Sequence, residues 1–454
     1  MKKLCLFLII SKLAFAQTIS FEEALNQTIE NSKDLQKQKI NIDIAKTNSD
    51  FIDGLNFGKV SLNSDISRTN HSGYVFMGKL SNRDATFRDF GFIENTGNPN
   101  DIDIDIAPKD LNYPDSYTSI NSYISYDLPL FTGFALYHQK GILKLQEKAN
   151  EILYNLDKKT LEFEVLKAYN SAVLAKDFVK TMQKAKDTIG FIKNGAKEFH
   201  KNGLVTKIDV NEAELHFLNT NSNLIEAENN LKLSLAYLKF LTSNENISDV
   251  ENLQNTYLEI KEFEDLYKIA LKNRDEITLQ NISIEANNKN IKANQGSYYP
   301  SVFTHLEYGY NDDKFSTSKD KDYYMALLGI SLTLFDGTRS ANLEKSRLEY
   351  LKAKLDFEKL QDGIKLEVQK AILDYKAKQE ILKEKILASE LASSVLNQAK
   401  LQYKNRLISM TTLLSQETNY RQSQTMLLNA KYENSLALAR LNLVLGQNLQ
   451  KDYK

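Results

Sequence analysis

The residues that could carry catalysis or bind a metal are few and widely spaced. The five histidines are His71, His138, His200, His216 and His305. No two of them have the spacing of a metal-ligand pair. The sequence also contains no glycine-rich phosphate loop and no nucleophile elbow. We therefore expect no enzyme, no metal centre and no cofactor.

One acidic run offers ligands of the kind that calcium prefers. Asp101, Asp103 and Asp105 alternate with isoleucines within a loop at about residues 71–117. Carboxylate oxygens bind Ca²⁺, but no glycine turn and no terminal glutamate completes a calcium loop here. A solvated surface loop is therefore the favoured interpretation, with a cation site as the alternative.

Composition and the N-terminus indicate an exported protein. The 58 basic and 59 acidic residues give a net charge of −1, without the basic excess that nucleic-acid binding requires. Residues 1–16 have the pattern of a secretory signal: Lys2 and Lys3, an apolar run, and a small-residue cleavage site before Gln17. The only cysteine, Cys5, lies inside this signal, so the mature protein has no disulfide.

Four stretches alternate between apolar and polar residues, at about 58–69, 118–131, 300–310 and 323–335. Even-numbered positions form the apolar face in all four, which predicts strands of a length that spans a bilayer when tilted. Four strands cannot close a barrel, and open edges are not tolerated in lipid. A cyclic trimer with twelve strands is the simplest closed assembly. The alternative is a soluble sheet with one face covered, but the predicted helices are rich in charge.

Long helices are predicted to follow the strands. In the first half of the chain they read as about 21–55, 134–202 and 207–242. The middle helix would be about 100 Å long, and the other two about half that length each. Its apolar residues recur in steps of four and three, as in a coiled coil: Leu161, Val165, Ala168, Ala172, Ala175, Val179 and Met182.

The sequence contains an internal twofold repeat. Offsets of 242 and 203 residues align the second half with the first and give one order in both: short helix, strand pair, very long helix, turn, short helix. Gly133 and Gly337 mark the two junctions from strand to long helix. We divide the chain into a signal (1–16), repeat 1 (17–242), an equatorial linker (243–260), repeat 2 (261–446) and a short tail (447–454).

Each long helix ends in a turn that contains apolar residues, at 201–210 and at 404–413. Exposed apolar clusters usually mark contacts, which favours docking of a partner here over internal capping of the bundle. Thr206 and Asp209 have the spacing of a helix capping box, a purely structural role.

The chain resembles the TolC family of trimeric outer-membrane channel-tunnels in three features taken together. These are the turn Gly203-Leu204-Val205 followed by Asp209-Val210, the twofold repeat, and the Leu-Phe-x-Gly junctions. The resemblance covers about residues 19–446. It implies an α+β membrane protein, with a trimeric twelve-stranded β-barrel in the outer membrane. A periplasmic α-helical coiled-coil barrel would continue it. The family implies a passive exit duct for efflux or type I secretion. A periplasmic adaptor and an inner-membrane pump of the RND or ABC type would open it.

By the same resemblance, the adaptor would dock on Gly203, Leu204, Val205, Leu407 and Ile408. Asp209 and Tyr403 would help to hold the tip closed.

Two departures from the family pattern matter. Arg406 replaces the usual glycine of the second turn, so the adaptor is not expected to dock identically at both turns. Thr412 and Ser415 stand where a relative carries acidic rings, so we expect only weak block by multivalent cations. A soluble periplasmic coiled-coil scaffold or adaptor is the competing function.

Overall fold

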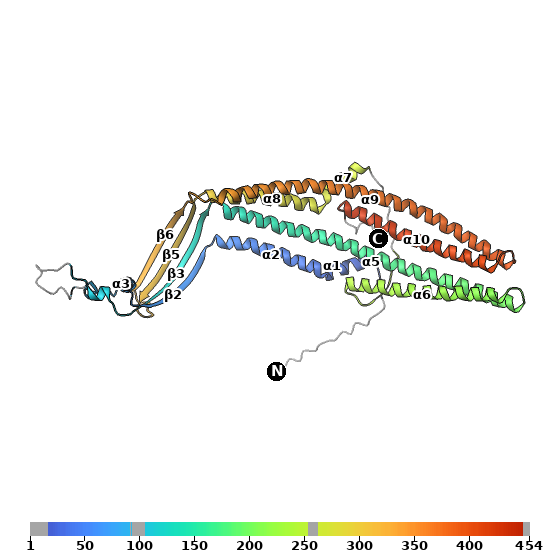
Figure 1. Cartoon of the computed structure of the whole chain (residues 1–454), viewed down its shortest axis with the longest axis horizontal. Coiled ribbons are helices and arrows are strands. Elements are labelled where there is room, and N and C mark those ends of the chain that lie inside the picture. Colours follow the sequence, from blue (N-terminus) through green and yellow to red (C-terminus); the bar gives the residue numbers. More distant parts are fainter. Residues whose placement is uncertain (1–16, 91, 93–104, 253–261, 448–454) are drawn as a thin grey trace, which may run out of the picture. The chain divides into compact units, whose positions relative to one another are not determined.

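The computed structural model describes residues 17–90, 92, 105–252 and 262–447. The chain divides into two compact units. The helical unit comprises Met1–Ile42, Lys148–Ile282 and Lys354–Lys454, and the strand unit comprises Asp43–Glu147 and Ser283–Ala353 (Figure 1). The predicted signal, residues 1–16, lies outside the described residues.

The strand unit contains an antiparallel four-stranded sheet. Its strands are β2 (Lys59–Thr69), β3 (Tyr117–Thr132), β5 (Ser301–Asp312) and β6 (Asp322–Ser331), in the order β2-β3-β5-β6 (Figure 1). All four lie where the alternation predicts them, except that β6 ends at Ser331 rather than near 335. In the described part of the chain, β2 and β6 each pair on one side only.

The two faces of this sheet differ as the alternation predicts. The apolar even-numbered side chains project outward, and Val60, Leu62 and Ile330 are 69%, 78% and 72% exposed. The odd-numbered face carries a polar network across strands. The two ring nitrogens of His305 lie 2.6 and 3.2 Å from carboxylate oxygens of Asp127 and Glu307.

The helices follow the predicted order in both halves. Repeat 1 has α1 (Phe21–Asn31), α2 (Lys33–Leu55), α5 (Ala135–Lys201) and α6 (Lys207–Thr242). Repeat 2 has α7 (Phe263–Asn273), α8 (Asp275–Gln295), the one-turn η2 (Gly296–Tyr298), α9 (Arg339–Lys404) and α10 (Met410–Val444). None of the helices in the described ranges combines the length and apolar composition that a bilayer crossing requires.

The prediction of one helix over 21–55 is wrong, because the chain breaks at Ser32. The Ser32 hydroxyl accepts a hydrogen bond from the Leu35 amide at 3.3 Å, so a serine cap ends one helix and starts the next. Arg274, which is equivalent to Ser32 by the offset of 242, separates α7 from α8 in the same way.

Two similar cores hold the helical unit together, one in each repeat. Val165 and Ala168 of α5 are buried in the first core, and their equivalents Val368 and Ala371 of α9 are buried in the second. The first core also covers a short parallel pair of strands that the sequence did not predict, β1 (Gln17–Ile19) and β4 (Ile247–Val250). The two internal repeats are therefore confirmed in the packing.

The loop expected at about 71–117 includes short helical segments that the sequence did not predict. It contains α3 (Ser72–Ser81), the short helix η1 (Phe87–Phe90) and α4 (Lys109–Asn112). Asp101 and Asp103 lie outside the described residues. The acidic group that the structure does bring together is Asp84, Asp312 and Asp313. The ammonium of Lys321, 2.5 Å from Asp84, partly balances its charge.

Candidate functional site

The turns that end the two long helices have the same backbone geometry. In the first, the amide of Gly203 donates to the carbonyl of His200 at 2.9 Å, and the amide of Leu204 donates to that of Phe199 at 2.8 Å. In the second, Arg406 and Leu407 make the equivalent bonds to Tyr403 and Gln402, both at 2.9 Å. These are the paired bonds of a Schellman turn, which satisfies the last carbonyls of a helix.

Arg406 keeps the turn although it replaces a glycine. Gly203 has φ +71° and Arg406 has φ +62°, so both residues occupy the left-handed region. A residue with a side chain pays on the order of 1 kcal/mol to adopt that region. The surrounding hydrogen bonds hold Arg406 in this conformation. The two turns therefore have the same backbone path, and the second adds an exposed cation at Arg406.

The apolar residues of the turns divide into an outward and an inward set. Leu204 and Leu407 are 43% and 72% exposed. Val205 is half-buried, and Ile408 packs against a small core beneath the turns. This tip core contains Ile192, Ala196, Ala213, Leu396, Ala399, Met410, Leu413 and Leu414. Both roles considered for this apolar cluster thus have a structural counterpart: two leucines face outward, and Ile408 caps the bundle.

Asp209 forms the capping box that its spacing predicts. Its carboxylate accepts a hydrogen bond from the Thr206 amide at 2.8 Å, and the Thr206 hydroxyl accepts one from the Asp209 amide at 3.3 Å. The hydrogen bonds from the Thr206 hydroxyl and amide hold the pKa of Asp209 below its usual value. Asp209 is therefore an anion at neutral pH, at the N-terminus of α6.

Tyr403 lies beneath the turns with an unusual hydroxyl. Its ring packs beside Phe199, with centroids 6.0 Å apart. The hydroxyl is buried and has no hydrogen-bond partner within the described residues. Burial, and after it the negative charge of Asp209, raises the pKa of Tyr403. The structure thus brings these two predicted gate residues close enough for the charge of Asp209 to act on the Tyr403 hydroxyl.

Sequence reasoning missed a pair of glutamates next to the tip. Glu214 and Glu417 occupy equivalent positions in the two repeats, yet their surroundings differ. Glu214 lies 3.4 Å from Lys193 and 2.9 Å from Lys197, and hydrogen bonding to Lys197 lowers its pKa. Glu417 is 1% exposed, and its Oε2 accepts no hydrogen bond from any residue that the structure describes. Burial raises the pKa of Glu417, although Arg421 opposes this from 3.7 Å.

The two junction glycines also differ. Gly133 has φ +62°, and a Cβ built there would lie 2.2 Å from the carbonyl oxygen of Gly296. Gly337 has no positive φ, and among the described residues the nearest atom to a Cβ built there, outside its chain neighbours, is 3.9 Å away in the Phe335 ring. Only the first junction therefore requires glycine, both for its backbone and for its close contact.

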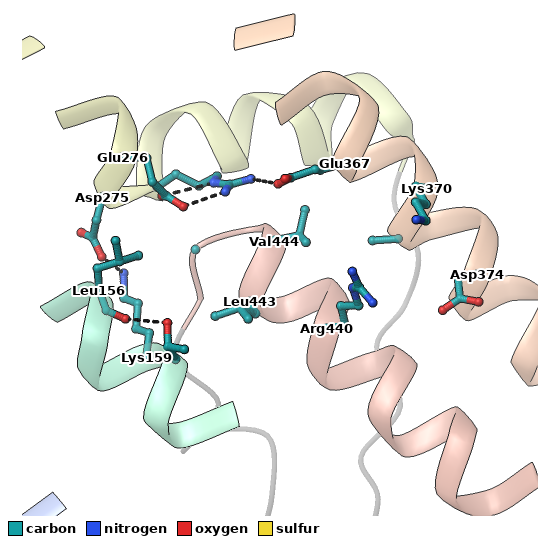
Figure 2. Close-up of a pocket in the computed structure, with 14 residues that line it drawn as sticks. Leu156, Lys159, Asp275, Glu276, Glu367, Lys370, Asp374, Arg440, Leu443 and Val444 are labelled. Carbon is teal, nitrogen blue, oxygen red and sulfur yellow. Dashed lines mark hydrogen bonds and ion pairs between the residues drawn. The ribbon is translucent and has the colours of Figure 1, made fainter. Parts of the chain in front are cut away.

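A hollow of about 360 Å³ in the helical unit is lined mainly by charged side chains (Figure 2). The guanidinium of Arg274 lies 2.7 Å from Glu276 and 2.5 Å from Glu367, and Lys159 lies 2.8 Å from Asp275. Burial opposes the charge of Arg274, but these hydrogen bonds hold its pKa above the usual value. The ion pairs join Asp275 of α8 to α5, and Arg274 between α7 and α8 to α9, so we assign the hollow a structural role.

Comparison with known proteins agrees with this fold. Residues 266–447 match the model of the outer membrane efflux protein family. No curated protein sequence matches the chain. Among solved structures, CusC, described in terms of transmembrane channel formation, has a TM-score of 0.77 at 14% identity over 95% of this chain and 93% of its own.

Two further structures are similar over nearly the whole chain. The outer membrane channel CmeC of Campylobacter jejuni has a TM-score of 0.74 at 14% identity over 94% of this chain and 85% of its own. The open state of the outer membrane channel MtrE of Neisseria gonorrhoeae has a TM-score of 0.74 at 16% identity, covering 95% and 90%. The fold inferred from the sequence is confirmed, and the match of residues 266–447 to the family model agrees with the resemblance.

Proposed function

We propose that this chain, which has the fold of the TolC-like outer-membrane channels and matches the outer membrane efflux protein family over its second repeat, is a passive exit duct. Three copies would form a twelve-stranded barrel in the outer membrane that continues into a periplasmic helical tunnel. An adaptor would dock at the paired turns, and an inner-membrane pump would drive efflux or type I secretion. The observation that carries the proposal is a sheet with an apolar outer face and two unpaired edges.

The sheet favours a barrel shared between copies. Unpaired amides and carbonyls at β2 and β6 are not tolerated in lipid, so each edge must find a partner strand. Pairing β6 of one copy with β2 of the next satisfies both edges by rotation alone. Eight strands leave an interior that side chains fill, so three copies form the smallest barrel of this type with an open lumen. The polar odd-numbered face would line it.

The helices carry matching evidence for assembly. α6 has an exposed apolar row that steps by seven, three and seven residues, through Ile208, Leu215, Leu218 and Ile225. α9 has a second row at multiples of seven, Leu366, Leu373, Leu387 and Leu401, which are 67%, 60%, 61% and 65% exposed. Such spacing is typical of coiled-coil seams. Within the described residues each repeat thus presents an exposed seam, and we assign these two rows to contacts with neighbouring copies.

The outward leucines of the two turns fit the docking role. Leu204 and Leu407 would insert into a helical hairpin of the adaptor, while Gly203 lets the backbone approach closely. Val205 and Ile408 would shape the turn from below. Asp209 and Tyr403 would contribute to closure of the tip.

Assembly is tested by a single charge placed in a seam. Leu373→Glu should abolish the heat-sensitive oligomer on gels, because a carboxylate would be buried between copies. Gln379→Glu adds the same charge on α9 outside the leucine row and should leave the oligomer intact. A stable heat-sensitive oligomer in Leu373→Glu would exclude the α9 row from the contacts between copies, and a protein that leaves the membrane in high salt would favour the soluble scaffold.

Docking is tested at the tip. In cells whose own duct gene is replaced by this one, Leu407→Glu should lower the efflux of a fluorescent pump substrate while leaving the oligomer unchanged. Lys404→Glu, an exposed charge change in the same turn, serves as the control. Normal efflux in the Leu204→Glu, Leu407→Glu double variant would exclude these leucines from docking.

A further inference from the structure

The segment from α3 to Asp84 crosses the sheet at its outer end. It leaves the sheet after Thr69, the last residue of β2, and its far end is tied to the turn before β6 by a hydrogen bond from Arg83 to the carbonyl of Asp320. Because the sheet order is β2-β3-β5-β6, this path runs from one edge to the other. Three strand spacings amount to about 14 Å, and the ten residues of α3 are about 15 Å long. We call residues 72–84 the strap.

The strap lies on the odd-numbered face of the sheet. A Cβ at Gly78 would lie 3.3 Å from the ring of Tyr117 and 3.6 Å from the Cβ of Ser119, both odd-numbered residues of β3. The amide of Asn82 donates to the Tyr117 hydroxyl at 2.9 Å, and its carbonyl oxygen accepts from Ser119 at 3.1 Å. Asn82 is fully buried by these contacts. The strap thus packs on the polar face rather than the apolar one.

Charged side chains fasten the far end. The guanidinium of Arg83 donates to the main-chain carbonyls of Asp320 and Asp322 at 2.5 and 2.6 Å. The ammonium of Lys321 donates to the carbonyl of Asn82 and to the carboxylate of Asp84, both at 2.5 Å. Arg83 itself adopts φ +57°, a conformation that an arginine holds only where its surroundings impose it. Four charge-assisted hydrogen bonds therefore close the strap across the sheet.

We propose that the strap is a size filter at the outer mouth of the pore. The proposal rests on the barrel described above, in which the odd-numbered face lines the lumen. Three straps, one from each copy, would then project into the opening. A helix with its side chains is about 10 Å across, and a twelve-stranded barrel is only half again as wide as one whose interior side chains fill. Docked straps leave room for small solutes and exclude folded polypeptides.

The filter can be tested from the outside of intact cells, so that the state of the periplasmic tip has no influence. The mature chain is predicted to lack cysteine, so a single cysteine can be placed in the lumen. Asp65 is exposed, lies on the odd face of β2, and is four residues, about 13 Å, below the end of the strand. Asp65→Cys is labelled from outside with a small maleimide and with a maleimide carried on a long polyethylene glycol chain.

With the strap docked, the small reagent should react at least about tenfold faster than the large one. Adding Asn82→Ala and Arg83→Ala should raise the rate of the large reagent about tenfold or more, because the removed hydrogen bonds include charge-assisted ones. Adding Arg88→Ala instead removes an exposed cation from the same loop and should change neither rate. Where the double variant loses the heat-sensitive oligomer, Arg83→Ala alone gives the readout.

Each outcome has a distinct meaning. Equal rates of the large reagent with intact and released straps overturn the filter and leave the barrel standing. Ser64→Cys, on the even face, reports on the barrel itself, since a residue in lipid does not react with water-soluble maleimides. If Ser64→Cys reacts and Asp65→Cys does not, the faces are assigned wrongly, and the proposed function fails together with the filter.

Discussion

Glu417→Gln should stabilise the tip at neutral pH, although it removes a charged residue that has a basic neighbour. The Glu417 side chain lies in α10 beside a small hollow of about 80 Å³, lined also by Lys184, Tyr420 and Arg421. One carboxylate oxygen, Oε2, has no hydrogen-bond partner within the described residues. The nearest cation among them, the Nε of Arg421, lies 3.7 Å from it, too far for a hydrogen bond. Glutamine keeps the shape of the side chain and removes the buried charge.

The size of the effect follows from the unmet hydrogen bond. A buried polar group without a partner costs about 1–3 kcal/mol, and more when it is charged. Attraction to Arg421 and Lys400 offsets part of this cost. We therefore expect Glu417→Gln to raise the free energy of local opening by about 1.4 kcal/mol, a factor of about ten in the opening equilibrium.

The effect should depend on pH with a definite sign. Burial raises the pKa of Glu417 in the folded protein above its ordinary value of 4.5, so folding favours the protonated form. Below pH 4.5 the group is protonated in both states, and no penalty exists. As the pH rises above 4.5 the unfolded state loses its proton first, so the penalty grows, and it reaches its full size once the pH exceeds the folded-state pKa. The advantage of glutamine should therefore vanish near pH 4.

Amide hydrogen exchange measures this local opening directly. At pH 7.5, exchange of the α10 amides around position 417 should be about tenfold slower in Glu417→Gln than in the unmodified protein. Glu214→Gln is the matched control: it removes a partly exposed glutamate with two lysine partners and should not slow exchange. Faster exchange in Glu417→Gln at neutral pH would refute the reasoning, because it would show that the ion pair with Arg421 outweighs the burial cost.

Three further predictions concern single side chains. Gly133→Ala should prevent oligomer formation through its clash with the carbonyl of Gly296, while Gly337→Ala should leave the heat-sensitive oligomer on gels unchanged. Tyr169→Phe should lower stability by about 1–2 kcal/mol in thermal circular dichroism, because it removes the hydroxyl that donates to carbonyls at β1 and beside β4. Multivalent cations should block the channel only weakly in planar bilayers; tight block that Asp209→Ala abolishes would contradict this.

The strands and long helices were predictable because each is a periodic pattern sustained over many residues. The even-numbered apolar positions fix which face of each strand is apolar, and a shift by one residue would invert them all. The coiled-coil steps around Val165 likewise predict a buried row, which the structure places in the core. Such patterns report burial directly, so tertiary contacts seldom override them.

The features that escaped the sequence depend on contacts between distant residues. α3 is only ten residues long and is held by partners as far away as Lys321. The helix break at Ser32 rests on one local cap, assisted by the side chain of Asn31, which donates to the carbonyl of Thr242 at 2.9 Å. The alignment of the repeats pairs Glu214 with Glu417, but it does not show that one is solvated and the other buried.

The two tip hairpins are alike in backbone and unequal in stability. The α5–α6 turn has a glycine in the left-handed position and a full capping box with a carboxylate. The α9–α10 turn has Arg406 in that position, and at Thr412 only a hydroxyl cap from Ser409. Each difference is on the order of 1 kcal/mol, and the buried Glu417 acts in the same direction.

These differences all weaken the second hairpin, so the α9–α10 tip should open more readily than the α5–α6 tip. Hydrogen exchange on the unmodified protein tests this: amides of α10 next to Ser409 should exchange at least about tenfold faster than those of α6 next to Thr206. Arg406→Gly should relieve backbone strain and so reduce the difference in exchange rate between the two tips. Gly203→Arg should raise the exchange rate of the first hairpin toward that of the second. Equal exchange at both tips would mean that contacts between the hairpins, such as the Thr411 hydroxyl on Glu212, couple them into one unit.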